Sequence, residues 1–113
     1  MVEKLKVYQK AMNVAEEISG FADKFSRNNF YLADQLNRAS LSISCNIAEG
    51  NGRHHKKERK QFFRIARASA HECIPLLEMC LRKNLIDSET HGRLMQNLEE
   101  ISKMLSGLIR GLG

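Results

Sequence analysis

Residues 94–112, LMQNLEEISKMLSGLIRGL, carry Leu or Ile at positions 94, 98, 101, 105, 108 and 112. The intervals of 4, 3, 4, 3 and 4 residues bring these side chains to one face of an α-helix, because a helix completes a turn about every 3.6 residues. A half-buried strand would show apolar residues at alternate positions instead. The segment therefore predicts an amphipathic helix that packs one apolar stripe against other helices.

The first helix of the chain is expected over residues 3–25. Its apolar residues recur three or four positions apart, at Leu5, Tyr8, Met12, Ala15, Ile18, Ala22 and Phe25. Val7, Val14 and Phe21 form a neighbouring stripe. The apolar arc then covers about 200°, twice the ~100° that one core face requires. This excess predicts a second packing partner, which another subunit could supply.

Two more helices are expected, over residues 30–49 and 56–83. The inward residues of the second helix are Leu32, Leu36, Ala39, Ile43 and Ile47, and those of the third are Phe62, Ile65, Ala66, Ala70, Cys73, Leu77, Cys80 and Leu81. Gly50 and Gly52 are expected to end the second helix in the left-handed conformation that glycine adopts readily. Pro75 predicts a kink in the third helix and not its end, because the apolar spacing continues beyond it. Asp87 or Ser88 is the expected N-cap of the last helix.

Four helices joined by short connections predict an all-α fold, an antiparallel up-down-up-down four-helix bundle. The 113 residues, of which 42% are hydrophobic and 27% charged, are expected to form one domain, residues 1–113. No apolar run approaches the ~20 residues of a membrane span, and the charged start MVEKLK is unlike a signal peptide. A cytoplasmic protein is therefore expected, with Cys45, Cys73 and Cys80 as reduced core thiols.

The net charge of +5 is concentrated in one segment, residues 52–67. Seven cations lie there, against Glu58 alone: Arg53, Lys56, Lys57, Arg59, Lys60, Arg64 and Arg67. This basic block carries +6, whereas the other residues hold 11 Lys and Arg against 12 Asp and Glu, or −1. A charge run is usually a solvated face, and that interpretation stays open. The alternative is a surface that binds RNA or DNA with little base specificity through Arg53, Lys56, Lys57, Arg59, Lys60 and Arg64.

A polar stripe lies beside the apolar face of the second helix. Its members are spaced 3, 4, 4 and 3 residues apart: Gln35, Arg38, Ser42, Asn46 and Glu49. Arg67, Ser69 and Glu72 of the third helix are the expected partners, since buried charges and polar groups must be paired. The favoured interpretation is a structural network that fixes helix register or a subunit interface. The alternative is a site for a ligand or partner.

The run from Gln35 to Arg53 and the segment FFRIARAS at residues 62–69, followed by Glu72, resemble the signatures of a known family. This is the four-helix bundle protein family, also called the 23S ribosomal RNA intervening-sequence protein family. The opening segment LKVYQKA at residues 5–11 is also similar to it. The chain departs from the family pattern at residues 28–30, where proline and acidic residues are frequent, and at Ala68, which is commonly glycine.

This resemblance implies a four-helix bundle that assembles as a ring-like homopentamer, without catalytic activity. The genes of the family lie within inserts of large-subunit ribosomal RNA genes in some bacteria, and elsewhere as ordinary genes. The label "ribosomal protein" reflects that location and not a place in the ribosome. A related protein, the accessory variability determinant of diversity-generating retroelements, forms a basic pentameric barrel that binds reverse transcriptase and nucleic acid. The implied partners are therefore other copies of the chain, RNA or DNA, or a nucleic-acid-bound protein such as a reverse transcriptase.

Signatures of enzymes are missing from the sequence. It has no Gly-rich phosphate loop, no Cys-x-x-Cys and no Glu-x-x-His pair, so we expect no catalytic residue, metal or cofactor. Arg64 and His71 match the Arg-x(4–6)-His pattern of HEPN ribonucleases, although Ile65 replaces the polar residue that usually follows the Arg. The expected function is a non-enzymatic, homo-oligomeric, nucleic-acid-binding bundle. The alternatives are a protein-only interaction adaptor and, less favoured, this ribonuclease.

Overall fold

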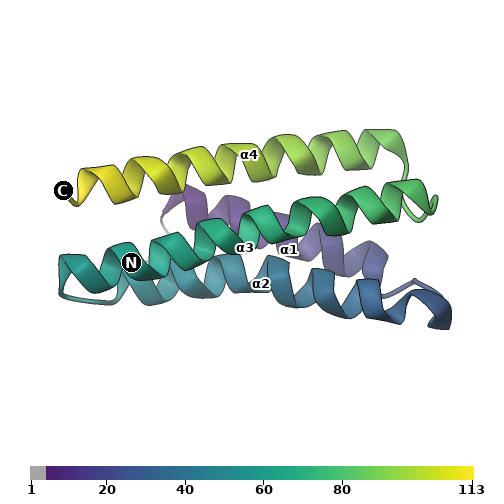
Figure 1. Ribbon diagram of the computed structural model, residues 1–113, viewed down its shortest axis with the longest axis horizontal. Coiled ribbons are helices and arrows are strands. Elements are labelled where there is room, and N and C mark those ends of the chain that lie inside the picture. Colours follow the sequence, from purple (N-terminus) through teal and green to yellow (C-terminus); the bar gives the residue numbers. More distant parts are fainter. Residues whose placement is uncertain (1–4) are drawn as a thin grey trace.

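A computed structural model describes residues 5–113 and shows four long α-helices packed side by side (Figure 1). The elements are α1 (Lys6–Ala22), the short 3-10 helix η2 (Arg27–Asn29), α2 (Phe30–Asn51), α3 (Lys56–Arg82) and α4 (Ser88–Gly111). The helices contact one another in the closed order α1–α2–α3–α4–α1, within an envelope of 44 × 22 × 21 Å. The predicted all-α four-helix bundle is confirmed. The expected start of the first helix at Glu3 lies outside the described residues.

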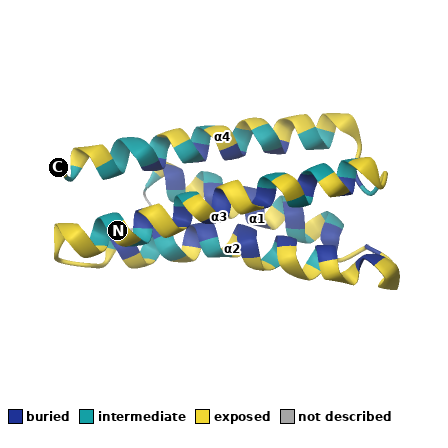
Figure 2. Ribbon diagram, in the orientation of Figure 1, coloured by how far each residue is buried: buried dark blue, intermediate teal, exposed yellow. Residues whose placement is uncertain are grey.

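The buried face of α1 lies between the two apolar stripes of its sequence. It takes Ile18 and Ala22 from one stripe and Val7 and Val14 from the other, whereas Met12 remains 37% exposed. Met12 therefore lies on the part of the apolar arc that the core does not cover. A wide apolar arc is buried best along its middle, which leaves one edge of the arc outside the core. Figure 2 shows buried residues along the inward faces of the helices.

The predicted core of α2 is confirmed, because all five expected residues from Leu32 to Ile47 are buried. The expected left-handed ending at Gly50 and Gly52 is wrong. Gly50 lies within the helix, and Gly52 has a φ of −87°. Asn84, in the turn after α3, does adopt a positive φ, of 60°. Gly50 has a steric role instead, because an added Cβ would lie 2.7 Å from the ring of Phe63.

In α3 the buried aromatic residue is Phe63, at 1% exposure, and not Phe62, which is half-buried. Ile65 is 38% exposed, so its expected inward position is also wrong. The helix continues without interruption through Pro75 to Arg82. The predicted cap of α4 is confirmed at Asp87, whose carboxylate accepts a hydrogen bond of 2.7 Å from the backbone N–H of Thr90.

The cysteines are all free, and two of the three occupy the core. Cys73 and Cys80 are buried, as expected, whereas Cys45 is exposed on the outer side of α2. The expectation of a core thiol at Cys45 is wrong. Cys45 is two residues from the buried Ile43 and Ile47, and two residues correspond to about 200° on a helix, which points the side chain away from the core.

Candidate nucleic-acid interface

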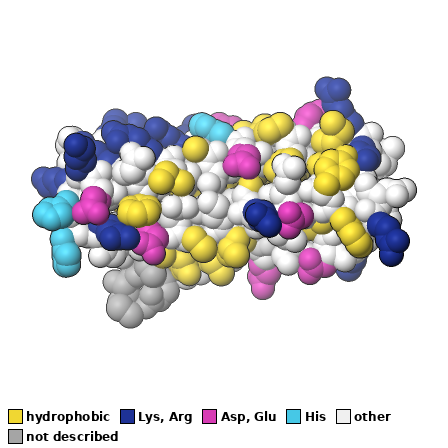
Figure 3. All heavy atoms as spheres, turned by 60° about the horizontal axis from the view of Figure 1, so that its bottom comes forward, with side chains coloured by type: hydrophobic (Ala, Val, Ile, Leu, Met, Phe, Trp, Pro, Cys, Tyr) yellow, Lys and Arg dark blue, Asp and Glu magenta, His cyan; other side chains and the backbone are white. Residues whose placement is uncertain are grey.

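The basic block occupies the turn between α2 and α3 and the first three turns of α3. This end of the bundle also holds the end of α4, at the left of Figure 1. In the space-filling view of Figure 3, Lys and Arg side chains gather at this end, with His side chains beside them. Arg53, Lys56, Lys57 and Arg64 are exposed, and Arg59 and Lys60 are half-buried. The bundle thus brings the six candidate residues to one end of the molecule.

Within α3, four cations and His71 form a single row. Its members are spaced 4, 4, 3 and 4 residues apart: Lys56, Lys60, Arg64, Arg67 and His71. At 3.6 residues per turn they fall within an arc of about 80°, and the row is about 22 Å long. We call these five residues the basic row.

Three contacts show that the basic row follows the junction with α4. Arg67 Nη1 donates to Ser106 Oγ at 3.0 Å, and His71 Nε2 lies 3.0 Å from Ser102 Oγ. Near the end of the chain, Lys60 Nζ donates to the backbone oxygen of Gly113. Ser102 and Ser106 are four residues apart, as are Arg67 and His71, so the two antiparallel helices are joined by two consecutive polar contacts.

Sequence reasoning did not identify the serines of α4 as neighbours of the basic block. The spacing of the apolar residues in α4 does indicate on which side of that helix the two serines lie. Leu98, Ile101 and Leu105 define its buried face, and Ser102 and Ser106 lie on one flank of that face at a spacing of four. Which neighbouring helix that flank meets depends on the handedness of the bundle, which the pattern of one helix does not reveal.

Most cations of the basic block lack an acidic partner. Within residues 5–113, Arg53 is the one member that pairs with a side-chain carboxylate, that of Glu49 at 2.9 Å. Its guanidinium also lies over the ring of Phe62, 5.0 Å from the ring centroid. Arg53 is thus tied to α2 and α3, whereas the charges from Lys56 to Arg67 are not neutralised by neighbouring carboxylates.

The polar stripe of α2 is joined to α3 through a small cluster of neutral groups. Ser42 Oγ lies 2.9 Å from Ser69 Oγ. Asn46 Nδ2 donates to Ser42 Oγ at 3.0 Å and to the Ser42 carbonyl at 2.8 Å. Ser69 is buried, and Ser42 and Asn46 are half-buried. These three residues, which belong to the larger polar set expected from the sequence, contact one another between the two helices.

The charged residues of the stripe do not join that network, so their expected burial and mutual pairing are wrong for the single chain. Arg38 pairs with Asp34, and its side chain is 80% exposed, whereas the side chain of Glu49 is 54% exposed. Arg67 lies two residues from Ser69, about 200° around the helix, so it faces α4 while Ser69 faces α2. Gln35 and Glu72 are exposed.

Arg64 and His71, the pair expected in a ribonuclease, both belong to the basic row. They are seven residues apart, which corresponds to about 10 Å along the helix axis. His71 is in contact with Ser102 of α4.

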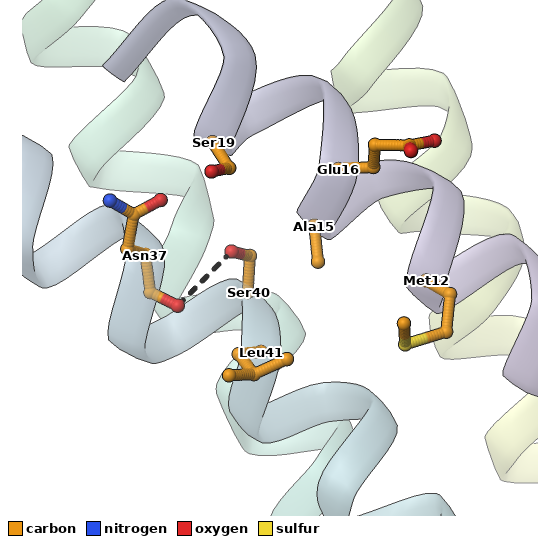
Figure 4. A pocket seen from close by; sticks show the side chains of 7 residues that line it. All are labelled: Met12, Ala15, Glu16, Ser19, Asn37, Ser40 and Leu41. Atoms are coloured by element: carbon orange, nitrogen blue, oxygen red, sulfur yellow. Dashed lines mark hydrogen bonds between the residues drawn. The ribbon is translucent and has the colours of Figure 1, made fainter. Parts of the chain in front are cut away.

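An open groove of about 270 Å³ lies between α1 and α2, away from the basic row (Figure 4). Ala15 of α1 lies across from Ser40 of α2, whose hydroxyl donates to the Asn37 carbonyl at 3.4 Å. Met12 and Leu41 line the same groove and are 37% and 50% exposed. The groove combines small and apolar side chains, which allows another surface to approach closely.

The described helices offer neither a cluster of metal ligands nor a membrane span. From residue 5 to residue 113, no three His, Cys, Asp or Glu side chains are grouped so that they could hold a metal ion. Over the same part of the chain, no helix has both the length and the apolar character that crossing a membrane requires.

Known proteins share this fold and sequence pattern. The bundle is similar to the crystal structure of a protein with unknown function from the S23 ribosomal protein family of Bacteroides thetaiotaomicron VPI-5482, with a TM-score of 0.85 and 25% sequence identity. The similarity covers 91% of this chain and 97% of that one. No curated protein matches the sequence. Residues 3–107 match the family described as 23S rRNA-intervening sequence protein, and neither description names a catalysed reaction. The chain belongs to the 23S rRNA-intervening sequence protein family.

Proposed function

We propose that this protein is a homo-oligomer that binds RNA or DNA through its basic block and catalyses no reaction. The observation that carries the proposal is the set of cations from Lys56 to Arg67, none of which pairs with a side-chain carboxylate of residues 5–113. They extend from the α2–α3 turn along α3. Phosphate backbones bind such surfaces because each neutralised phosphate releases counterions.

The rest of the surface differs from the basic block in how its cations are paired. Outside the block, several of them lie beside a carboxylate, namely Lys10, Arg38, Arg82, Arg93 and Lys103. Mixed and paired charges are what an ordinary solvated face shows. The absence of such pairing from Lys56 to Arg67 within the described chain therefore favours a binding surface over a merely solvated one.

Oligomerisation would multiply this surface. The groove with the exposed Met12 and Leu41 supports contact with a second copy of the chain, and the family resemblance implies five copies. Several modest basic surfaces that act on one polyanion gain avidity without strong individual contacts. We therefore expect the assembly to bind more tightly than one chain.

The proposal is tested by reversing four charges of the block, with Lys56, Lys57, Lys60 and Arg64 each changed to Glu. Binding of a fluorescein-labelled RNA or DNA is followed by anisotropy as salt is raised. The wild type should bind at low salt, with a log–log slope of about −0.7 to −0.9 per phosphate neutralised. The variant should lose this binding and keep its subunit number.

The matched control reverses four charges at the opposite end of the bundle: Lys24, Arg27, Arg82 and Lys83. Both variants change the net charge equally, so a specific surface predicts that this control still binds. Equal loss in the two variants would show that net charge alone explains binding. If the wild type binds neither RNA nor DNA at low salt, the protein-only adaptor replaces this proposal.

A further inference from the structure

A hollow of about 340 Å³ opens between α3 and α4 at the end of the basic row that lies far from the α2–α3 turn. Three of the side chains that line it are apolar, Ile74, Met95 and Leu98, and we call these three its floor. The polar side chains that line it include His71, Ser102 and Lys103, and we call the polar part its rim. The volume falls within the range of about 300–1,000 Å³ that small-molecule sites occupy. The row of cations thus ends at a cavity whose floor is apolar.

The rim of this hollow is chemically mixed. Lys103 Nζ lies 3.1 Å from Glu99 Oε1, and Glu99 also lines the cavity. The rim therefore offers a carboxylate that can accept N–H groups, besides the hydroxyl of Ser102 and the ring of His71. On the floor, the thioether of Met95 is polarizable, and sulfur makes favourable contacts with aromatic rings.

A nucleobase fits these surroundings, because its faces are flat and apolar and its edges carry hydrogen-bonding groups. We propose that the hollow takes one unstacked base of a single-stranded nucleic acid whose phosphates lie along the basic row. This inference rests on the proposed function and adds the form of nucleic acid that the surface selects. Arg67, one helical turn before His71, would then contact the phosphate next to the inserted base.

Selection for a single strand follows from the position of the hollow. A duplex holds its bases within the stack, and extracting one costs a few kcal/mol. A charged surface alone would favour the duplex, because its phosphates are more densely spaced and release more counterions per contact. Preference for single strands is therefore the result that separates base insertion from simple charge attraction.

The first test uses the wild-type protein and needs no substitution. Anisotropy is measured with matched single strands and duplexes, as RNA and as DNA, at one salt concentration. The same single strands carry 2-aminopurine, whose fluorescence is quenched by stacking. We expect single strands to bind about tenfold more tightly than duplexes, and 2-aminopurine fluorescence to rise on binding. The RNA and DNA arms identify which of the two nucleic acids is bound.

The second test removes part of the floor without changing charge. Met95→Ala should weaken single-strand binding severalfold, up to about tenfold, because it removes the sulfur contact with the base, and should leave duplex binding unchanged. Met79→Ala is the matched control, because Met79 is a 43% exposed residue of α3 outside the hollow. Far-ultraviolet circular dichroism establishes that both variants are folded.

The outcomes separate this inference from the proposed function. Equal or tighter binding of duplexes, with no rise in 2-aminopurine fluorescence, would overturn base insertion and leave the basic surface in place. Wild-type protein that binds neither form at low salt would overturn both. If Met95→Ala does not fold, base insertion is still tested with the wild type, by comparing its affinity for single strands and duplexes and by following 2-aminopurine fluorescence.

Discussion

A Cβ atom added to Gly50 would lie 2.7 Å from Cε1 of Phe63 and 3.2 Å from the carbonyl oxygen of Arg59. Phe63 is 1% exposed, so its ring has little free volume into which it can move. The lack of a side chain at Gly50 therefore allows α2 and α3 to approach closely beside the turn that bears the basic block.

Gly50→Ala should consequently destabilise the bundle. Overpacking a filled core costs about 1–3 kcal/mol, and alanine recovers about 1 kcal/mol through its better helix propensity. The measurement is the free energy of unfolding from a urea titration.

Gly92→Ala is the matched control, because an added Cβ at Gly92 meets nothing within 4 Å in α4. It should stabilise the protein by about 0.5–1 kcal/mol through propensity alone. If both substitutions shift the urea midpoint in the same direction, the contact with Phe63 does not limit the packing.

The neutral network between α2 and α3 should matter more for stability than the charged residues beside it. Asn46→Ala removes two hydrogen bonds to Ser42 and should cost about 1 kcal/mol. Arg38→Ala removes an exposed pair with Asp34 and should change stability by less than about 0.5 kcal/mol. Urea titration compares the two variants. A larger loss for Arg38→Ala, or a change in its subunit number, would indicate that the stripe is buried between subunits.

The cap of α4 should make stability depend on pH. Hydrogen bonds from Thr90 lower the pKa of Asp87 below its usual 3.8. The stabilisation by the carboxylate is therefore complete above pH 3.8 and is lost as the pH falls through the lowered pKa of the folded state. Urea midpoints of the wild type and of Asp87→Asn, measured from pH 7 to pH 2, provide the test.

The amide introduced by Asp87→Asn would keep an oxygen that accepts from Thr90 but would not titrate, so the variant isolates the effect of charge. The wild type should be the more stable protein at neutral pH, because a negative charge at a helix N-terminus is favourable. This advantage should shrink in acid. A difference that stays constant down to pH 2 would contradict the assigned role of the carboxylate.

The assembly can be tested by light scattering coupled to size exclusion. One chain has a mass of 12.9 kDa, and we expect a multiple of this value, with five copies favoured. Met12→Glu combined with Leu41→Glu should reduce the mass, since it places charge in the α1–α2 groove, whereas Met79→Glu should not. A monomer mass of the wild type at micromolar concentration would rule out the homo-oligomer.

The ribonuclease alternative makes an opposite prediction for His71. If the protein only binds RNA, then RNA incubated with wild type, Arg64→Ala or His71→Ala should stay equally intact on a denaturing gel. Cleavage by the wild type without added metal, lost in His71→Ala, would establish a nuclease.

The fold was accessible from the sequence because its apolar spacing is regular and its helix breakers are few. The regular stripes of α2 and α4 predicted their buried residues, from Leu32 to Ile47 and from Leu94 to Leu105. The arc of α1 was broader than one face, and a broad arc does not show where its centre lies. The exposure of Met12 follows from that ambiguity.

The sequence-based predictions were wrong where the position of a side chain depended on a neighbouring helix. The choice between Phe62 and Phe63 depends on the space left by Gly50, which belongs to a different helix. The position of Arg67 depends on which flank of α3 meets α4. Spacing alone did show that Arg67 and Ser69 point in different directions, and that signal could have prevented their assignment to one network.

The exposed position of Cys45 has a practical consequence. Burial raises the pKa of the Cys73 thiol to about 12, with the charge of Glu72 adding to the shift, and burial likewise raises the pKa of Cys80 against the opposing charge of Lys83. Because the thiolate is the reactive form, a maleimide at neutral pH should modify Cys45 and leave the two buried thiols intact. The native sequence therefore supplies one attachment point per chain on the outside of α2. A dye placed there would allow copies to be counted in single-molecule bleaching experiments without an engineered cysteine.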